Sequence, residues 1–123
     1  MRFIPTRIHG MADYGTGLLL LVAPYLLGFA NGGAAQYIPM LLGVAIIGMS
    51  LITDYELSIS RIIPMPVHLG IDVAGGLLLA ASPWLFGFAD QVAWPHVIVG
   101  LLEVGAGLMT RTHPDEYGTG LAA

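Results

Sequence analysis

Long apolar runs separated by polar links dominate the chain. Four such runs occupy residues of about 12–30, 37–53, 68–89 and 94–110. Each approaches the ~17 to 25 residues that an α-helix needs to cross a lipid bilayer. The pattern therefore predicts an all-α fold, a bundle of four transmembrane helices within a single integral membrane domain that covers residues 1–123.

The links between the runs differ in length and polarity. Residues 31–36 and 90–93 form short outer turns, which predicts that each joins two antiparallel helices into a hairpin. The middle link, about 54–67, is longer and more polar, and we interpret it as the boundary between two halves. Residues 112–123 are polar and glycine-containing, and they predict a flexible tail.

Composition supports a membrane protein and removes several other classes. Hydrophobic residues make up 56% of the chain and charged residues only 10%, far below the roughly 25% of an average soluble domain. There is no cysteine, so disulfides and thiolate metal sites are excluded, and the net charge of −4 argues against a nucleic-acid partner. Motifs such as a Walker loop, a GxSxG elbow or HExxH do not occur, and we expect no enzyme activity and no cofactor.

The four cations predict the orientation in the membrane. Arg2 and Arg7 precede the first run, Arg61 lies in the middle link and Arg111 follows the fourth run. The positive-inside rule then places both termini and the middle link in the cytoplasm. We expect a multi-pass protein of the cell membrane, of the bacterial inner-membrane type, whose first partner is the lipid bilayer.

The sequence contains an internal repeat. A shift of 59 aligns residues 9–31 with 68–90, and eleven of these 23 positions are identical. A shift of 57 aligns residues of the second helices, including Thr53 with Thr110. We interpret residues 9–53 and 68–110 as two copies of a helical hairpin, related by a pseudo-twofold axis along the membrane normal.

One tripeptide in the second copy carries a family resemblance. Ser82, Pro83 and Trp84 are followed by LFGF in the first helix of a two-helix unit, and the chain resembles the SPW repeat family of small integral membrane proteins. The resemblance covers about residues 9–110 and implies two transmembrane helices per repeat, without catalytic residues. In the first copy the tripeptide has become Ala23, Pro24 and Tyr25.

The proline of this motif suggests a mainly architectural role, with ligand contact as the alternative. Proline lacks an amide hydrogen, so Pro83 frees the Leu79 carbonyl, which then needs a donor such as Ser82 or a neighbouring helix. Trp84 and Tyr25 are suited to the headgroup region. The glycines four residues after each proline, Gly28 and Gly87, predict left-handed helix endings.

Glycines also predict how closely the helices pack. Gly43 and Gly48 in the second run match Gly100 and Gly105 in the fourth, and Gly17 matches Gly76. Small residues let helix backbones approach each other where hydrophobicity supplies no driving force. A compact bundle follows, and oligomerisation is plausible.

Two pairs of ionisable residues recur at the start of each copy. His9 with Asp13, and His68 with Asp72, are spaced i to i+4, so each pair shares a helix face. Together they could bind a metal, hold an anionic headgroup or pass a proton, provided that the first helix of one hairpin packs on the first helix of the other. The simpler interpretation, which we favour, is an aspartate that meets the helix dipole and a histidine that satisfies it at the interface.

Glu103 lies near the middle of the fourth run, where a charged carboxylate costs at least ~2.5–3.5 kcal/mol. Counting inward from the 90–93 turn predicts that Glu103 reaches the depth of residues 80–82. There it could donate to the carbonyl freed by Pro83, and a proton or cation relay that exits through His96 is the alternative. We expect His113 to be solvated.

Two classes of function remain open at this point. The first, which we favour, is a structural or accessory role through helix packing in a homo-oligomer or a larger membrane complex. The second is a conduit for protons, ions or a small solute that uses Glu103 and the His/Asp pairs.

Overall fold

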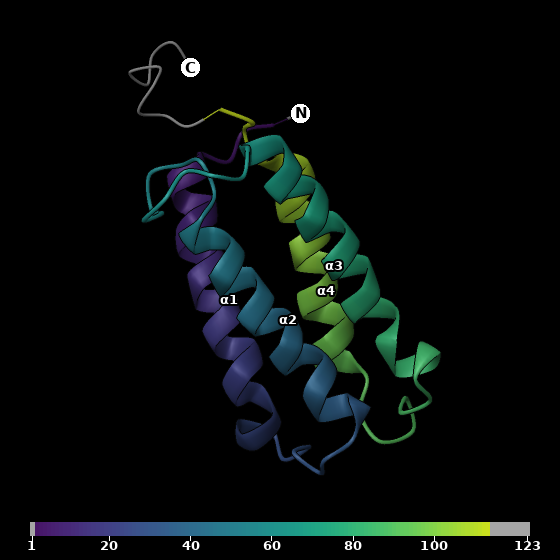
Figure 1. Cartoon of the computed structure of the whole chain (residues 1–123). Coiled ribbons are helices and arrows are strands. Elements are labelled where there is room, and N and C mark those ends of the chain that lie inside the picture. The colour runs from purple at the N-terminus through teal and green to yellow at the C-terminus, as the bar shows by residue number, and fades with distance from the viewer. Residues whose placement is uncertain (1, 114–123) are drawn as a thin grey trace.

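The computed structural model describes residues 2–113, which form four α-helices and no strand beyond isolated bridges (Figure 1). The helices are α1 (Thr6–Leu26), α2 (Ala34–Leu51), α3 (Met65–Leu85) and α4 (Trp94–Met109). The predicted all-α four-helix fold is therefore confirmed. The part of the predicted polar tail that follows His113 lies outside the described residues.

Two of the helices meet the length and hydropathy of a membrane span. These are α2 and α3, with 18 and 21 residues, whereas α4 is apolar but has only 16 residues. A helix of that length rises about 24 Å, somewhat less than the ~30 Å hydrocarbon core. That all four helices cross the membrane remains a prediction.

The outer turns lie closer to the first helix of each hairpin than predicted. They comprise residues 27–33 and 86–93 rather than 31–36 and 90–93. Gly28 and Gly87 adopt positive φ angles of 77° and 73°, as expected, and end α1 and α3. In each turn the amide of the following phenylalanine donates to the carbonyl of the repeat proline, at 2.8 Å. This bond is typical of a Schellman ending, so the glycine fixes where the helix stops.

Each hairpin is held together where two glycines meet. A Cβ atom added at Gly43 would lie 2.7 Å from the Gly17 carbonyl oxygen, and one added at Gly100 would lie 2.5 Å from that of Gly76. These close approaches join α1 to α2 and α3 to α4 at corresponding positions of the two halves. The two hairpins then meet each other mainly through α2 and α3.

The segment before α1 pairs with the end of α4, and the segment before α3 pairs with the end of α2. Ile4 forms a parallel bridge with Thr110, and Ile63 forms the corresponding bridge with Thr53. The segment before α1, the end of α4 and the middle link therefore lie at one end of the bundle, opposite the two outer turns (Figure 1). Arg2 reinforces this closure by donating to the carbonyls of Gly107 and Thr110, at 3.0 and 2.8 Å.

The tripeptide of the second copy has a distinct role for each residue. Ser82 is fully buried, and its hydroxyl donates to the Leu79 carbonyl at 2.7 Å, the acceptor that Pro83 leaves without an amide. Trp84 and its counterpart Tyr25 point outward, with 63% and 62% of their surface exposed. The side chain before the proline thus satisfies the backbone, and the one after it faces the surroundings.

Candidate functional site

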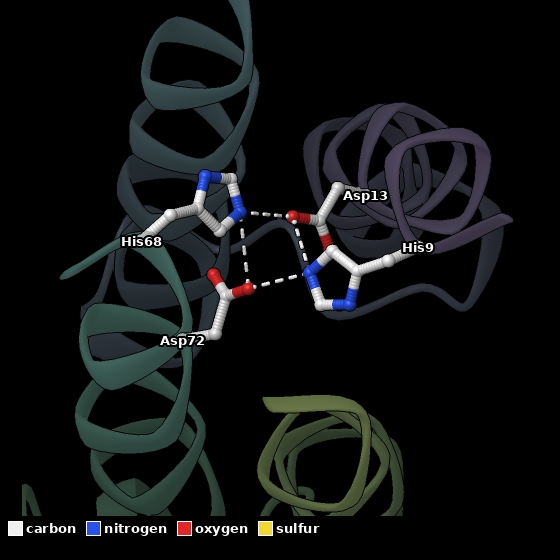
Figure 2. Close-up of side chains that lie close together, drawn as sticks. All are labelled: His9, Asp13, His68 and Asp72. Atoms are coloured by element: carbon white, nitrogen blue, oxygen red, sulfur yellow. Dashed lines mark hydrogen bonds and ion pairs between the residues drawn. The ribbon is translucent and has the colours of Figure 1, made fainter. Parts of the chain in front are cut away.

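Two buried histidines and two buried aspartates meet between α1 and α3 (Figure 2). His9 Nε2 lies 2.7 Å from Asp72 Oδ2, and His68 Nε2 lies 2.6 Å from Asp13 Oδ2. Within each helix the corresponding distances are longer, 3.0 Å for His9 to Asp13 and 3.1 Å for His68 to Asp72. The four atoms form a closed quadrilateral in which nitrogen and oxygen alternate. We call these four residues the His/Asp tetrad.

The tetrad is buried inside the bundle, whereas the favoured sequence interpretation placed these side chains at the membrane interface. None of its four residues exposes more than 3% of its surface. The expected pairing within each helix is also the weaker one, because the shortest contacts cross between the hairpins. The condition that the sequence left open, first helix against first helix, is met through these side chains.

Two threonines hold the histidines from outside the tetrad. Thr53 Oγ1 lies 2.6 Å from His68 Nδ1, and Thr110 Oγ1 lies 2.7 Å from His9 Nδ1. Each hydroxyl also donates its proton to the backbone carbonyl four residues earlier, at 2.7 and 2.6 Å. A hydroxyl has one proton, so each threonine must accept a hydrogen from the imidazole Nδ1–H. The Nε2 atoms face the aspartates, and each either donates a second hydrogen to a carboxylate or, in the neutral imidazole, offers its lone pair there.

The middle link covers the tetrad. Tyr55 is fully buried, its ring lies 5.9 Å from that of His68, and it packs against Gly10 of α1. Thr6, at the start of α1, donates to both carboxylate oxygens of Glu56 in the link, at 2.7 and 2.9 Å. Burial raises the pKa of the Tyr55 phenol, so Tyr55 closes the site as a neutral ring.

Glu103 joins the tetrad from α4. The charged neighbours of its carboxyl are Asp13, Asp72 and His9. Its Oε2 and Asp72 Oδ1 are buried without a hydrogen-bond partner. Both side chains line a cavity of about 340 Å³, whose remaining walls are Leu42, Ala45, Ile46, Met49, Ile52, Ile63, Ile71, Gly75, Gly76 and Leu79.

The expected partner of Glu103 was wrong by one helical turn. Glu103 packs against Gly76 rather than against residues 80–82, and Ser82 already satisfies the carbonyl freed by Pro83. The count took the outer turn as residues 90–93, but α3 already ends at Leu85. Glu103, nine residues after the start of α4 at Trp94, therefore lies opposite Gly76, nine residues before the end of α3.

His96 lies at the opposite end of the bundle and has a separate role. It is buried between the rings of Phe29 and Phe88, at 5.1 and 4.9 Å. Its Nε2 lies 2.9 Å from the Ala35 carbonyl oxygen. Pro39 occupies the position that would otherwise donate to this carbonyl, so His96 replaces a missing amide. His113 is exposed, as expected.

The sequence identified the ligand-like residues but missed their supports. His9, Asp13, His68, Asp72 and Glu103 were all singled out, and the structure brings them into one cluster. The threonines were aligned by the repeat but were given no role, although their identity at the polar end of both copies was a usable signal. No sequence pattern indicated that Tyr55 or Glu56 would cover the site.

The comparisons agree with the family resemblance. A family model described as the SPW repeat domain matches residues 7–110. No curated protein and no solved structure matches the chain.

Proposed function

Because the chain belongs to the SPW repeat family, we propose that it is an integral membrane protein of four transmembrane helices with a structural or accessory role. It acts through helix packing, with further copies of itself or with a larger membrane complex. The proposal includes no catalytic chemistry of its own.

The distribution of polar and apolar side chains carries this proposal. Large hydrophobic residues point outward on all four helices, among them Leu18, Leu41, Leu77 and Leu102. The histidine, aspartate and glutamate side chains within the four helices instead lie buried between them. This arrangement is suited to a bilayer, where the lipid solvates the apolar exterior and polar groups must find partners inside the protein.

The arginines support an orientation with the chain ends in the cytoplasm. Arg2, Arg7, Arg61 and Arg111 all belong to the end of the bundle that holds the His/Asp tetrad. The positive-inside rule places that end in the cytoplasm. Because the chain has no cysteine, Ser60→Cys and Asn31→Cys each introduce a single label site. An impermeant thiol reagent added outside intact cells should modify the cysteine at 31 and not the one at 60.

Glycines that face outward support the accessory role. Gly48 on α2 and Gly105 on α4 occupy corresponding positions of the two copies, and a Cβ atom added at either would meet nothing within 4 Å. In lipid, such flat places allow the close approach of another helix. The outer face of the bundle therefore offers docking sites that its own fold does not use.

Fractionation and mild-detergent purification test the two parts of this proposal. We expect the chain in the membrane fraction, and native mass spectrometry should show a defined homo-oligomer or a stoichiometric partner. Replacing Gly48 and Gly105 by leucine should weaken that assembly, whereas Gly33→Leu in the outer turn is a control. A monomer without a partner would contradict the accessory role, and recovery from the aqueous fraction would contradict the membrane placement.

A conduit is the second candidate, and the cavity beside Glu103 and Asp72 favours it. A core cluster of Leu20, Ile46 and Leu79 separates this cavity from a smaller one of about 190 Å³ next to His96. This apolar barrier makes the conduit the weaker proposal. Liposomes that contain the protein should collapse an imposed proton or ion gradient, and Glu103→Gln should slow this flux. Flux no greater than that of empty liposomes would eliminate the conduit.

A further inference from the structure

The centre of the His/Asp tetrad requires positive charge. In the neutral form of each imidazole the Nε2 lone pair points at aspartate oxygens, because the Nδ1 hydrogens are donated to Thr53 and Thr110. Two lone pairs that face two carboxylates across 2.6–3.1 Å repel one another unless a cation or protons lie between them. Two neutral imidazoles and two carboxylates carry a charge of −2, which one divalent cation balances.

The donor set selects the kind of cation. Imidazole nitrogen binds zinc, copper, nickel and iron, whereas the hard ions magnesium and calcium prefer an all-oxygen environment. All four donor atoms lie within 4.8 Å of one another. Neighbouring ligands of a zinc ion are separated by about 2.9 Å in a square and about 3.4 Å in a tetrahedron. The atoms of the tetrad need to move apart by no more than several tenths of an ångström to accept such an ion.

We propose that the His/Asp tetrad binds one first-row divalent transition-metal ion, which links α1 of the first hairpin to α3 of the second. The ligand atoms are His9 Nε2, His68 Nε2, Asp13 Oδ2 and Asp72 Oδ2. Since all four come from the protein, the ion fills a closed site and has a structural role. This site goes beyond the proposed accessory role and departs from the sequence-based expectation of no cofactor.

The residues around the tetrad are placed to hold and orient the proposed metal ligands. Each ligating histidine donates the hydrogen on its Nδ1 to a threonine hydroxyl. This hydrogen bond orients the ring and raises the basicity of Nε2. Glu103 lies near Asp13, where it can serve as the outer hydrogen-bonding group that metal-binding carboxylates usually have. The Oδ1 of Asp72 is buried without a hydrogen-bond partner, and the Asp72 side chain lines the cavity of about 340 Å³.

Metal content and affinity test the proposal directly. The tag-free full chain, purified in detergent and stripped with a chelator, should bind one Zn²⁺ per chain in calorimetry and elemental analysis. Cobalt should give the visible absorption bands of a low-coordinate N/O site, and excess Zn²⁺ should abolish them. Magnesium and calcium should not compete. If the stripped protein is incubated with Zn²⁺, dialysed, and then retains no Zn²⁺, the proposal is overturned.

Isosteric variants locate the ion within the tetrad. Asp13→Asn and Asp72→Asn each keep the side-chain shape, and each should lower Zn²⁺ affinity at least ~10-fold, with a larger loss in the double variant. If either variant loses helical content by circular dichroism, Thr53→Val supplies the second test. This substitution leaves all four ligands in place and should lower affinity by ~10–100-fold through His68 alone.

Two control variants exclude binding elsewhere. His113→Ala removes the exposed histidine near the chain end, and His96→Gln changes the buried histidine at the other end of the bundle. Both should bind Zn²⁺ as the unmodified chain does. If the tetrad variants bind equally well, or if His113→Ala abolishes binding, the tetrad is not the site. These results do not depend on whether the protein forms an oligomer, so the metal site and the accessory role fail separately.

Discussion

At the end of the bundle that contains the middle link, each half contributes a histidine, an aspartate and a threonine to one polar cluster. At the opposite end, Phe29 and Phe88 enclose the single histidine His96. We refer to these as the tetrad end and the aromatic end. Both ends are built from corresponding positions of the two halves. At the tetrad end each polar contact of one half has a counterpart in the other, whereas the hydrogen bond of His96 at the aromatic end has none.

The difference shows how two copies of a hairpin can be joined. Glycine contacts hold each hairpin together, but in lipid hydrophobicity provides little force between hairpins. The tetrad end supplies that force through hydrogen bonds and charge, and each half satisfies the other. The aromatic end instead combines shape with one hydrogen bond, from His96 to the carbonyl that Pro39 leaves free. Substitutions should therefore have matched effects at the tetrad end and unmatched effects at the aromatic end.

The largest effect should come from removing one histidine of the tetrad. His68→Ala removes the side chain that lies 2.6 Å from Asp13 and 3.1 Å from Asp72, and the loss of one partner from a buried cluster of this kind costs about 3–5 kcal/mol. His96→Ala leaves one carbonyl unpaired and should cost about 2 kcal/mol. Denaturant titration in mixed micelles measures both. Equal losses at the two ends would contradict the distinction between them.

Gly100→Ala should have the next largest effect. Its Cβ atom would lie 2.5 Å from both the Gly76 carbonyl oxygen and the Ala80 amide nitrogen, so α3 and α4 must separate. Overpacking of this kind costs about 1–3 kcal/mol. Gly105→Ala lies one and a half turns away on the same helix, meets nothing within 4 Å, and is the matched control. Its stability should be unchanged or slightly higher, because alanine favours helix more than glycine does.

The symmetry of the tetrad end can be tested through its threonines. Thr53→Val and Thr110→Val each remove the acceptor for an imidazole Nδ1–H and keep the side-chain volume. Each should cost about 1 kcal/mol, by the same mechanism in both halves. Thermal unfolding in detergent measures the pair under identical conditions. A large loss from one and none from the other would mean that the two halves do not contribute equally.

The smallest effect should follow from Ser82→Ala. Its hydroxyl is the donor for the Leu79 carbonyl, and hydrogen bonds between groups in membrane helices contribute about 0.6 kcal/mol on average. Ala23 occupies the same place in the first copy, where alanine already stands before the proline. A loss of several kcal/mol would show that Ser82 serves more than the backbone beside it, and the architectural interpretation of the tripeptide would be wrong.

Periodicity and local backbone chemistry were enough to predict much of the fold. Apolar runs gave the four helices, and the glycines after Pro24 and Pro83 gave the left-handed endings, because both depend on residues close together in the chain. The repeat also aligned Gly17 with Gly76 and Gly43 with Gly100, the glycines at which the helices touch. The start of the first helix was predicted less accurately. The apolar run begins at about residue 12, but α1 begins at Thr6, because polar residues such as His9 are buried in the helix by partners from other elements.

The sequence by itself determined which residues have unusual chemistry for an apolar chain: the two His/Asp pairs, Glu103 and the prolines. Their partners were decided by the tertiary structure alone. The spacing of His9 and Asp13 favours a contact within one helix, yet each aspartate lies closest to the histidine of the other hairpin. Likewise Glu103 lies opposite Gly76 and near the tetrad, one turn away from the depth that the count from the outer turn predicts. Contacts between helices depend on where the helices cross and on their register. The close approaches of Gly17 to Gly43 and of Gly76 to Gly100 fix both in three dimensions, and no local sequence pattern encodes them.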